Sequence, residues 1–223
     1  MDPAVWSAVR VSLVVAAGAL ALALPLGIAA GWFLARTRMR GRALLEACVL
    51  LPLVLPPVVT GYLLLVVFGR NGVLGGWLHD TFGVSLVFNT FGMMLAGAVV
   101  GLPLLVRAVE VAVRGVDPGL VDAARTLGHS RWGAFLRVTL PLARHGIIAG
   151  AVLAFARALG EFGATILVAP NLDGTRTLAL EIFRHASVPG GESMVFRLGA
   201  VSVALSLVAL LAAERLARPG GRR

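Results

Sequence analysis

Long apolar stretches, separated by short segments rich in arginine, make up most of this chain. A helix needs roughly 20 residues to cross a bilayer, and five stretches are long enough to do so. They span about residues 7–35, 44–68, 84–106, 143–168 and 196–213. The pattern predicts an all-α integral membrane protein with about five transmembrane helices. We expect residues 1–223 to form a single domain.

Composition supports the membrane prediction and excludes several classes of protein. The chain is 58% hydrophobic and 14% charged, whereas soluble domains carry about 25% charged residues. The single cysteine, Cys48, excludes a disulfide scaffold, and no histidine is placed to act as its base. All 20 basic residues are arginines, so the lysine of a phosphate-binding P-loop is missing. We therefore expect this chain to be no enzyme and to bind no metal, cofactor or ATP of its own.

The arginines are distributed unequally between the two sides of the predicted spans. Fourteen of the 20 lie after the first span, between the third and fourth spans, or after the fifth. The positive-inside rule therefore places the N-terminus outside and the C-terminus in the cytoplasm. The first span lacks a basic n-region and is followed directly by arginines, so we expect a retained helix rather than a signal peptide.

The charged segment 107–141, between the third and fourth spans, is predicted to be cytoplasmic and helical. Asp117 followed by Pro118 is typical of a helix N-terminus, and Gly128 is typical of a helix C-terminus. Ser130 predicts the start of a second helix that returns to the membrane. A short amphipathic helix of this kind suits insertion into a groove of a partner protein. The pattern alone fits a solvated surface hairpin equally well.

The same segment resembles a motif of a known family. The run 122–124 (Asp-Ala-Ala) is followed at fixed spacing by Gly128, Val138 and the pair 140–141 (Leu-Pro). This resembles the EAA loop of ABC importer permeases, with Asp in place of the family's Glu and Val in place of its Ile. In that family the loop forms a coupling helix that sits in a cleft of the ATPase subunit. The resemblance implies these coupling residues: Asp122, Ala123, Ala124, Arg125, Leu127, Gly128, Leu140 and Pro141.

Prolines interrupt the second predicted span. Each proline removes a backbone donor and clashes with the preceding turn, so this helix is expected to bend or break. The freed carbonyls must meet protein or water, which places the segment toward the bundle interior. The interruption is either a kink required for packing or part of a translocation pathway. The candidate pathway or gate residues here are Pro56, Pro57, Thr60 and Gly61.

The fourth predicted span carries two charges, Arg157 and Glu161, four residues apart. Charged residues inside a membrane are costly and mark functional sites. The alternative is an ion pair within one helix, which the spacing permits. Thr165 extends the same polar face. All three residues are therefore candidates for the pathway, and a purely structural pair stays open.

Further segments resemble the permease subunit of molybdate ABC importers, in the molybdate, tungstate and sulfate permease group. They are LPLVLPPVVTGYLLL, LAFARALGEFGATI, the external GTRT at 174–177 and PGGES at 189–193. The resemblance implies the small ABC importer permease fold in the cell (inner) membrane. It also implies a homodimer, two ATPase subunits that bind ATP and Mg, and an external oxyanion-binding protein. The implied function is ATP-driven molybdate import by alternating access; a tungstate or sulfate importer and an ATP-independent channel are the alternatives.

The number of spans and the external charges bear on the pathway and on docking. Five helices are too few to enclose a polar conduit, so we expect the path to lie between two copies of the chain. External arginines are balanced by acidic residues, which favours substrate selection by the binding protein. Residues 177–187 are predicted to form an amphipathic interfacial helix. The candidate docking residues for the binding protein are Thr175, Arg176, Gly190, Gly191 and Glu192.

Overall fold

The computed structural model describes residues 2–37, 39–170 and 172–217, and every regular element in these ranges is helical. The predicted all-α fold class is confirmed. The elements are α1 (Pro3–Arg36), α2 (Arg42–Val54), α3 (Pro57–Phe68), α4 (Val73–Phe82), α5 (Thr90–Arg114), α6 (Pro118–Thr126), α7 (Arg131–Ala134), a π-helical turn η1 (Phe135–Thr139), α8 (Leu140–Leu159), α9 (Thr165–Val168), α10 (Leu178–Ala186) and α11 (Glu192–Ala217).

Four helical runs in the described ranges are long and apolar enough to cross a membrane. They are α1, α5, α11 and the continuous run Arg131–Leu159, which comprises α7, η1 and α8. The pair α2 and α3 qualifies together as a fifth, broken span, whose halves are bent by 111°. The break lies at Leu55 and Pro56, within the proline run that predicts it.

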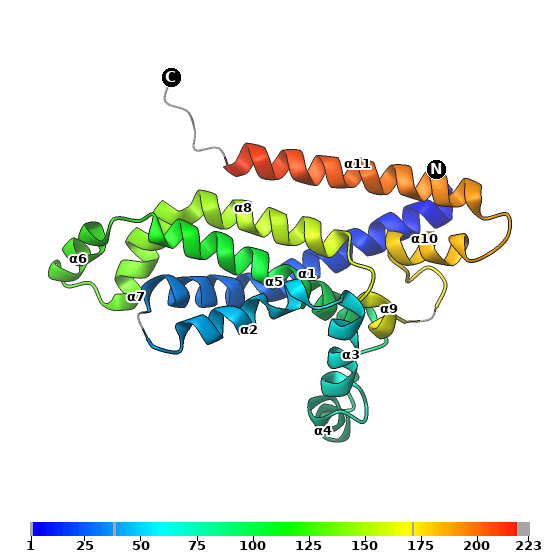
Figure 1. Cartoon of the computed structure of the whole chain (residues 1–223), viewed down its shortest axis with the longest axis horizontal. Helices are drawn as coiled ribbons and strands as arrows, with labels where there is room; N and C mark the ends of the chain where they lie inside the picture. Colours follow the sequence, from blue (N-terminus) through cyan, green and yellow to red (C-terminus); the bar gives the residue numbers. More distant parts are fainter. Residues whose placement is uncertain (1, 38, 171, 218–223) are drawn as a thin grey trace.

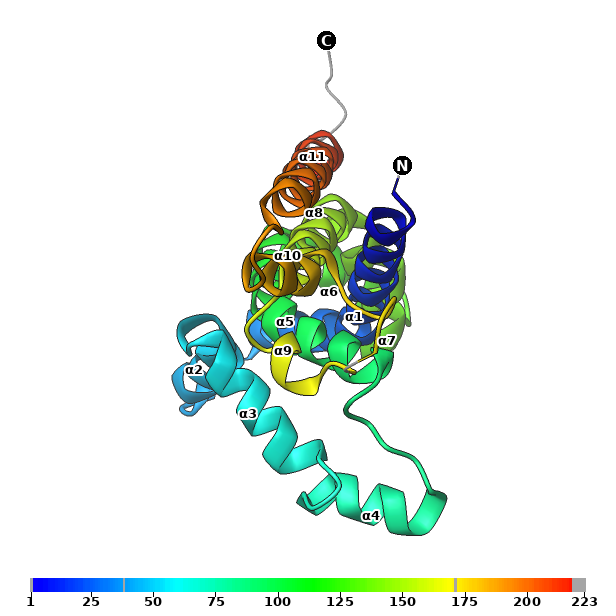
Figure 2. The same ribbon diagram turned by 90° about the vertical axis from the view of Figure 1, so that its right-hand side faces the viewer.

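Helices α1, α5 and α8 lie side by side at the centre of the bundle, and α11 runs along α8 (Figures 1 and 2). Small residues permit this close approach, as is usual between membrane helices. A Cβ atom on Gly27 of α1 would lie 2.4 Å from Leu105 Cδ2 of α5. A Cβ atom on Gly150 of α8 would lie 2.5 Å from Ala108 Cβ of α5. Side chains of α5 therefore fill the space that a Cβ atom would take at these glycines of α1 and α8.

Two helices have boundaries that differ from the sequence prediction. The third span is predicted from residue 84, but α5 begins at Thr90 because the Asn89 side chain caps it, accepting from Gly92 N at 3.0 Å. The fourth span is predicted to reach residue 168, but α8 ends at Leu159, before the separate short helix α9. Glu161 therefore lies outside the helix that carries Arg157.

The two ends of the bundle carry different elements. Helices α6 and α7 lie at one end, together with the last turn of α1 and the first turn of α2 (Figure 1). Helix α10, the start of α11 and the start of α1 lie at the opposite end (Figure 1). Helices α3 and α4 project sideways from the bundle (Figure 2). This arrangement separates the predicted coupling segment from the predicted docking segment.

Candidate coupling and translocation sites

The segment predicted to meet an ATPase folds as the short helix α6, beyond the end of α5 and α8 (Figure 1). Asp117 caps it, because its Oδ1 accepts a hydrogen bond from Gly119 N at 2.8 Å. Gly128 follows the helix with a φ of +88°, a left-handed conformation that favours glycine. Ser130 then caps α7 by accepting from Gly133 N at 3.1 Å. These caps lie at the residues that the sequence predicts.

Helix α6 turns one face toward the protein and leaves another uncovered. Ala124 is buried, whereas Leu127 is 81% exposed and Leu120 is 51% exposed. The neighbouring Asp122 and Ala123 are also exposed. Helix α6 and the turn after it thus present an uncovered apolar surface that includes Leu120 and Leu127.

Aromatic contacts attach the coupling segment to the end of α1. The Trp32 ring of α1 lies 5.2 Å from the Trp132 ring and 5.0 Å from the Phe135 ring. Phe135 opens the π-helical turn, a feature that is frequent at functional sites. Leu140 and Pro141, also predicted to serve coupling, lie beyond this turn in α8. The structure therefore separates them from the coupling residues of α6 and its following turn.

The two interrupted helices meet where α3 begins and where the chain leaves α8. A Cβ atom on Gly61 would lie 2.6 Å from the carbonyl oxygen of Ala164, and one on Gly163 would lie 2.8 Å from Pro57 Cβ. Thr60 is buried, and its hydroxyl has no hydrogen-bond partner within the described part of the chain. Two predicted gate residues, Pro57 and Gly61, are thus placed against the 163–164 turn. Two of the predicted gate residues are exposed: Pro56 and Pro57.

Arg157 and Glu161 form an ion pair beside this meeting point, with 2.6 Å between Nη1 and Oε2. The other carboxylate oxygen of Glu161 accepts from Ala164 N at 2.8 Å. Glu161 is 2% exposed, so both oxygens are used in a protein interior. The Thr165 hydroxyl donates to the carbonyl oxygen of Phe162 at 2.9 Å. The ion pair is therefore present, but it joins α8 to the turn that follows it and closes the turn between α8 and α9. The prediction that Arg157, Glu161 and Thr165 share one helical face is wrong, because α8 ends at Leu159 and Thr165 begins α9.

A network of ion pairs that was not predicted from the sequence lies at the end of the bundle that carries α6. Glu110 of α5 is 1% exposed. It accepts hydrogen bonds from Arg42 at 2.8 Å, from Arg107 at 2.9 Å and from Arg114. Arg42 also binds Glu46, at 2.7 Å. The spacing of Arg107, Glu110 and Arg114 on one helical face is the signal that could have revealed the network. Its effect is to tie α2 to α5.

The predicted amphipathic helix at 177–187 is present as α10, at the opposite end of the molecule. Its first backbone amide, on Leu178, donates to Ser12 Oγ of α1 at 2.8 Å. Just before it, Arg176 binds Asp173 at 2.6 Å. This hydrogen bond lowers the pKa of the Asp173 carboxyl and raises the pKa of Arg176. The loop that leads into α10 is thereby held by charge.

The other predicted docking residues lie on the two loops that flank α10. The Thr175 hydroxyl donates to a carbonyl oxygen of its own loop at 2.7 Å. Gly190 has a φ of +83°, and a Cβ atom on Gly191 would lie 2.1 Å from a carbonyl oxygen of α10. Both glycines therefore shape the turn into α11. Glu192, the first residue of α11, is exposed.

Comparison with known proteins gives consistent matches over nearly the whole chain. Residues 23–219 match the family described as "Binding-protein-dependent transport system inner membrane component". The chain is 51% identical over 214 residues to the molybdenum transport system permease protein ModB of Escherichia coli, covering 96% of this chain and 93% of that protein. It is 46% identical over 213 residues to the ModB protein of Haemophilus influenzae, covering 95% and 93%.

Solved structures share the fold at low sequence identity. A bacterial ABC transporter that imports the acidic polysaccharide alginate superimposes with a TM-score of 0.75 at 17% identity, covering 100% of this chain and 82% of that one. A bacterial alginate ABC transporter in complex with its pentasaccharide-bound periplasmic protein gives a TM-score of 0.73 at 18% identity, covering 98% and 80%. These likenesses show that the helices are arranged as in ABC importer permeases.

Proposed function

The chain belongs to the family of binding-protein-dependent transport system inner membrane components, and from this premise we propose that it is the permease subunit of an ATP-driven molybdate importer. It passes molybdate from an external binding protein to the cytoplasm by alternating access. Two copies of the chain assemble with two ATPase subunits, which bind the ATP and Mg. The N-terminus lies outside and the C-terminus lies in the cytoplasm.

The observation that carries this proposal is the capped helix α6, which presents Leu120 and Leu127 beyond the end of the bundle. A rigid helix with an uncovered apolar face suits a groove on a partner protein. The helix lies at the end of the bundle that is proposed to face the cytoplasm, where an ATPase has access to it. ATP-driven closure of the two ATPase subunits then draws the two α6 helices together.

A continuous helical run of 29 residues, Arg131–Leu159, leads from the turn after α6 toward the place where α3 meets the 163–164 turn. Its far end carries Arg157, which is tied to Glu161 in the turn that packs against α3. Movement of α6 is therefore transmitted along this run to the meeting point of the two broken helices. There it biases the permease between inward-open and outward-open arrangements, each stabilised by a different state of the ATPase.

Molybdate is proposed as the cargo because relatives at 51% and 46% identity carry molybdenum transport in their names. The charge of Arg157 is offset by Glu161 at 2.6 Å, so the path offers no strong anion trap at this point. Substrate selection is accordingly assigned to the external binding protein, which docks at the end that carries α10. A path that binds the anion only weakly favours release of the cargo into the cytoplasm.

The test is uptake of labelled molybdate by vesicles that contain this chain, its ATPase and its binding protein. We expect accumulation that requires ATP and the binding protein, with weak competition by excess sulfate or tungstate. Uptake without ATP would identify a channel instead. Strong competition by sulfate or tungstate against uptake of labelled molybdate would identify that anion as the cargo instead.

Gly128→Val tests the coupling role of α6 directly. Its φ of +88° is strained for a β-branched residue, so the turn after α6 should shift and uptake should fall while ATP hydrolysis continues. Gly83→Val is the matched control, because Gly83 has a φ of +69° and, as at Gly128, a Cβ atom added there would have no atom within 4 Å. Normal ATP-driven uptake by Gly128→Val would contradict the proposal.

A further inference from the structure

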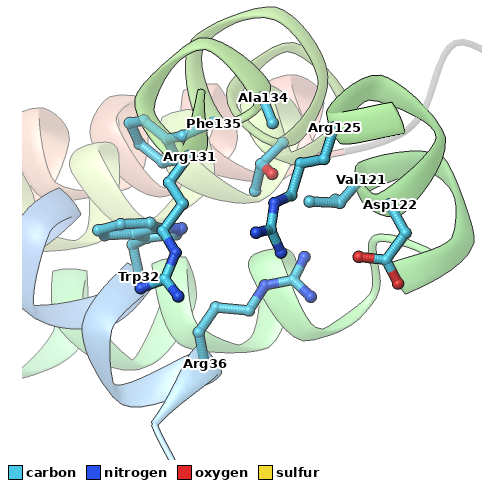
Figure 3. A pocket seen from close by; sticks show the side chains of 9 residues that line it. Trp32, Arg36, Val121, Asp122, Arg125, Arg131, Ala134 and Phe135 are labelled. Atoms are coloured by element: carbon cyan, nitrogen blue, oxygen red, sulfur yellow. The ribbon is translucent and has the colours of Figure 1, made fainter. Parts of the chain in front are cut away.

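A cavity of about 370 Å³ opens between the last turn of α1, helix α6 and the run formed by α7 and η1 (Figure 3). Water occupies about 30 Å³ per molecule in the liquid, so this volume accommodates a small polyatomic ion with its first waters. Its lining includes Trp32, Arg36, Val121, Asp122, Arg125 and Arg131. Residues far apart in the sequence thus meet around one polar space.

Three arginines line this cavity. Arg36 and Arg125 extend toward one another, and Arg131 lies beside the Trp32 ring (Figure 3). Within the ranges that the structure describes, none of the three is paired with an acidic side chain, although Asp122 lines the same cavity. The neighbouring network around Glu110 is different, because there each arginine is bound to a carboxylate.

Convergent positive charges repel one another, and a negative ligand between them removes that repulsion. Guanidinium groups are planar forks whose paired donors match the oxygens of tetrahedral anions. We propose that this cavity binds a tetrahedral oxyanion, held by Arg36, Arg125 and Arg131. The chemistry is shared by a free sulfate-like or phosphate-like dianion and by the singly charged phosphodiester of an anionic lipid headgroup.

A bound anion connects three helices between which the described residues form no ion pair. Arg36 belongs to α1, Arg125 to α6 and Arg131 to α7, so one ligand bridges all three elements. It therefore fixes the position of α6 relative to the bundle. Binding at this site does not depend on whether the chain transports molybdate, so it can be tested separately from the proposed function.

Sulfate binding to the full-length chain in nanodiscs of neutral phosphatidylcholine is the direct test. The chain has 4 tryptophans; replacing Trp6 and Trp77 by Phe leaves Trp32 and Trp132, whose rings lie 5.2 Å apart beside the cavity. We expect sulfate to change this tryptophan fluorescence in a saturable way. Sulfate should also raise the midpoint of thermal unfolding, because a ligand that binds only the folded state stabilises it.

Arg36→Gln and Arg131→Gln are the test variants, and Arg144→Gln, an exposed arginine of α8 outside the cavity, is the matched control. Each cavity variant should weaken sulfate binding about tenfold to a hundredfold, since each removes charged hydrogen bonds. The control should bind as the parent does. Arg131→Lys keeps the charge and should recover part of the affinity, which separates anion binding from a loss of folding.

Lipid composition distinguishes the two sources of the anion. A sulfate response that persists in nanodiscs with anionic phosphatidylglycerol supports a free dianion as the ligand. A sulfate response that is present in neutral discs and lost in anionic discs, with the same dependence on Arg36 and Arg131, means that the phosphatidylglycerol headgroup occupies the cavity and excludes sulfate. That result supports an anionic lipid headgroup as the ligand. Absence of any response, or an equal response in Arg36→Gln, Arg131→Gln and Arg144→Gln, would overturn the proposal.

Discussion

At the scale of single residues, the strongest constraint is the burial of acidic groups among arginines. Glu110 is 1% exposed and Glu161 is 2% exposed, and a carboxylate at such depth is stable only when it is paired. Both are paired here, by Arg42, Arg107 and Arg114 in one case and by Arg157 in the other. Removing the Glu161 carboxylate therefore breaks the ion pair of Arg157, and removing the Glu110 carboxylate breaks three ion pairs while Arg42 keeps Glu46.

Glu110→Gln should lower the free energy of unfolding by about 1.5–3 kcal/mol, the usual value of hydrogen bonds to charged groups. The amide keeps the volume of the side chain but removes the charge that Arg42, Arg107 and Arg114 share. Thermal unfolding of the purified chain measures the change. Glu192→Gln, at an exposed position, is the control and should have little effect. Equal stability of the two variants would show that the network does not hold α2 to α5.

Gly61→Ala probes the contact between the two broken helices. The added Cβ would lie 2.6 Å from the carbonyl oxygen of Ala164, and backbone cannot yield as a side-chain tip can. We expect a loss of about 1–3 kcal/mol in stability, the usual result of overpacking, together with reduced uptake. Gly199→Ala in α11, with no atom within 4 Å of its Cβ, should be neutral or slightly stabilising. A fully active Gly61→Ala would remove the case for a gate here.

At the scale of elements, the sequence predicts well those helix ends that depend on residues close together in the chain. The caps of α6 by Asp117 and of α7 by Ser130 depend on residues two or three positions away, so they can be read from spacing. The end of α8 at Leu159 also has a local signal, because Gly160 forms its C-cap, although the apolar residues around it favour a longer span. What spacing does not reveal is that the 163–164 turn packs against α3.

Some candidate sites are likewise predictable from local sequence, whereas others depend on tertiary packing. The coupling segment is predictable because its signal lies within about twenty consecutive residues. The ion pair of Arg157 with Glu161 is predictable from spacing, but its position beside Gly61 is set by tertiary packing. The cavity that joins Arg36 to Arg125 and Arg131 has no sequence signal, since it depends on how α1 ends against α6.

Leu127→Ser tests whether the exposed face of α6 binds a partner. This side chain is 81% exposed, so its loss should leave the stability of the isolated chain unchanged. Truncation of an apolar anchor in an interface costs about 2 kcal/mol, which corresponds to roughly 30-fold weaker binding of the ATPase subunit. Surface plasmon resonance with the purified ATPase measures it. Leu172→Ser, a 64% exposed leucine at the opposite end, is the control, and equal binding by both variants would contradict the coupling role.

At the scale of the whole molecule, the separation of the two ends gives the chain a direction. Helix α6 lies at the end where α1 finishes and α2 begins, and α10 lies at the other end (Figure 1). Arg36, Arg42 and the arginines of segment 107–114 flank the end with α6, and their charge favours the cytoplasmic side. Coupling from the cytoplasm and docking from outside therefore require that the bundle be inserted with α10 outward.

Cysteine labelling tests this orientation in a single membrane preparation. Cys48, which is exposed, is first replaced by Ser; then Leu127→Cys and Leu172→Cys are introduced separately, at positions that are both exposed. A membrane-impermeant maleimide should label Leu172→Cys in intact spheroplasts and should label Leu127→Cys only after permeabilisation. The reason is that the bilayer separates α6 from the loop before α10 in the proposed topology. Labelling of Leu127→Cys in intact spheroplasts would place α6 on the outer side, where no ATP-driven partner could reach it.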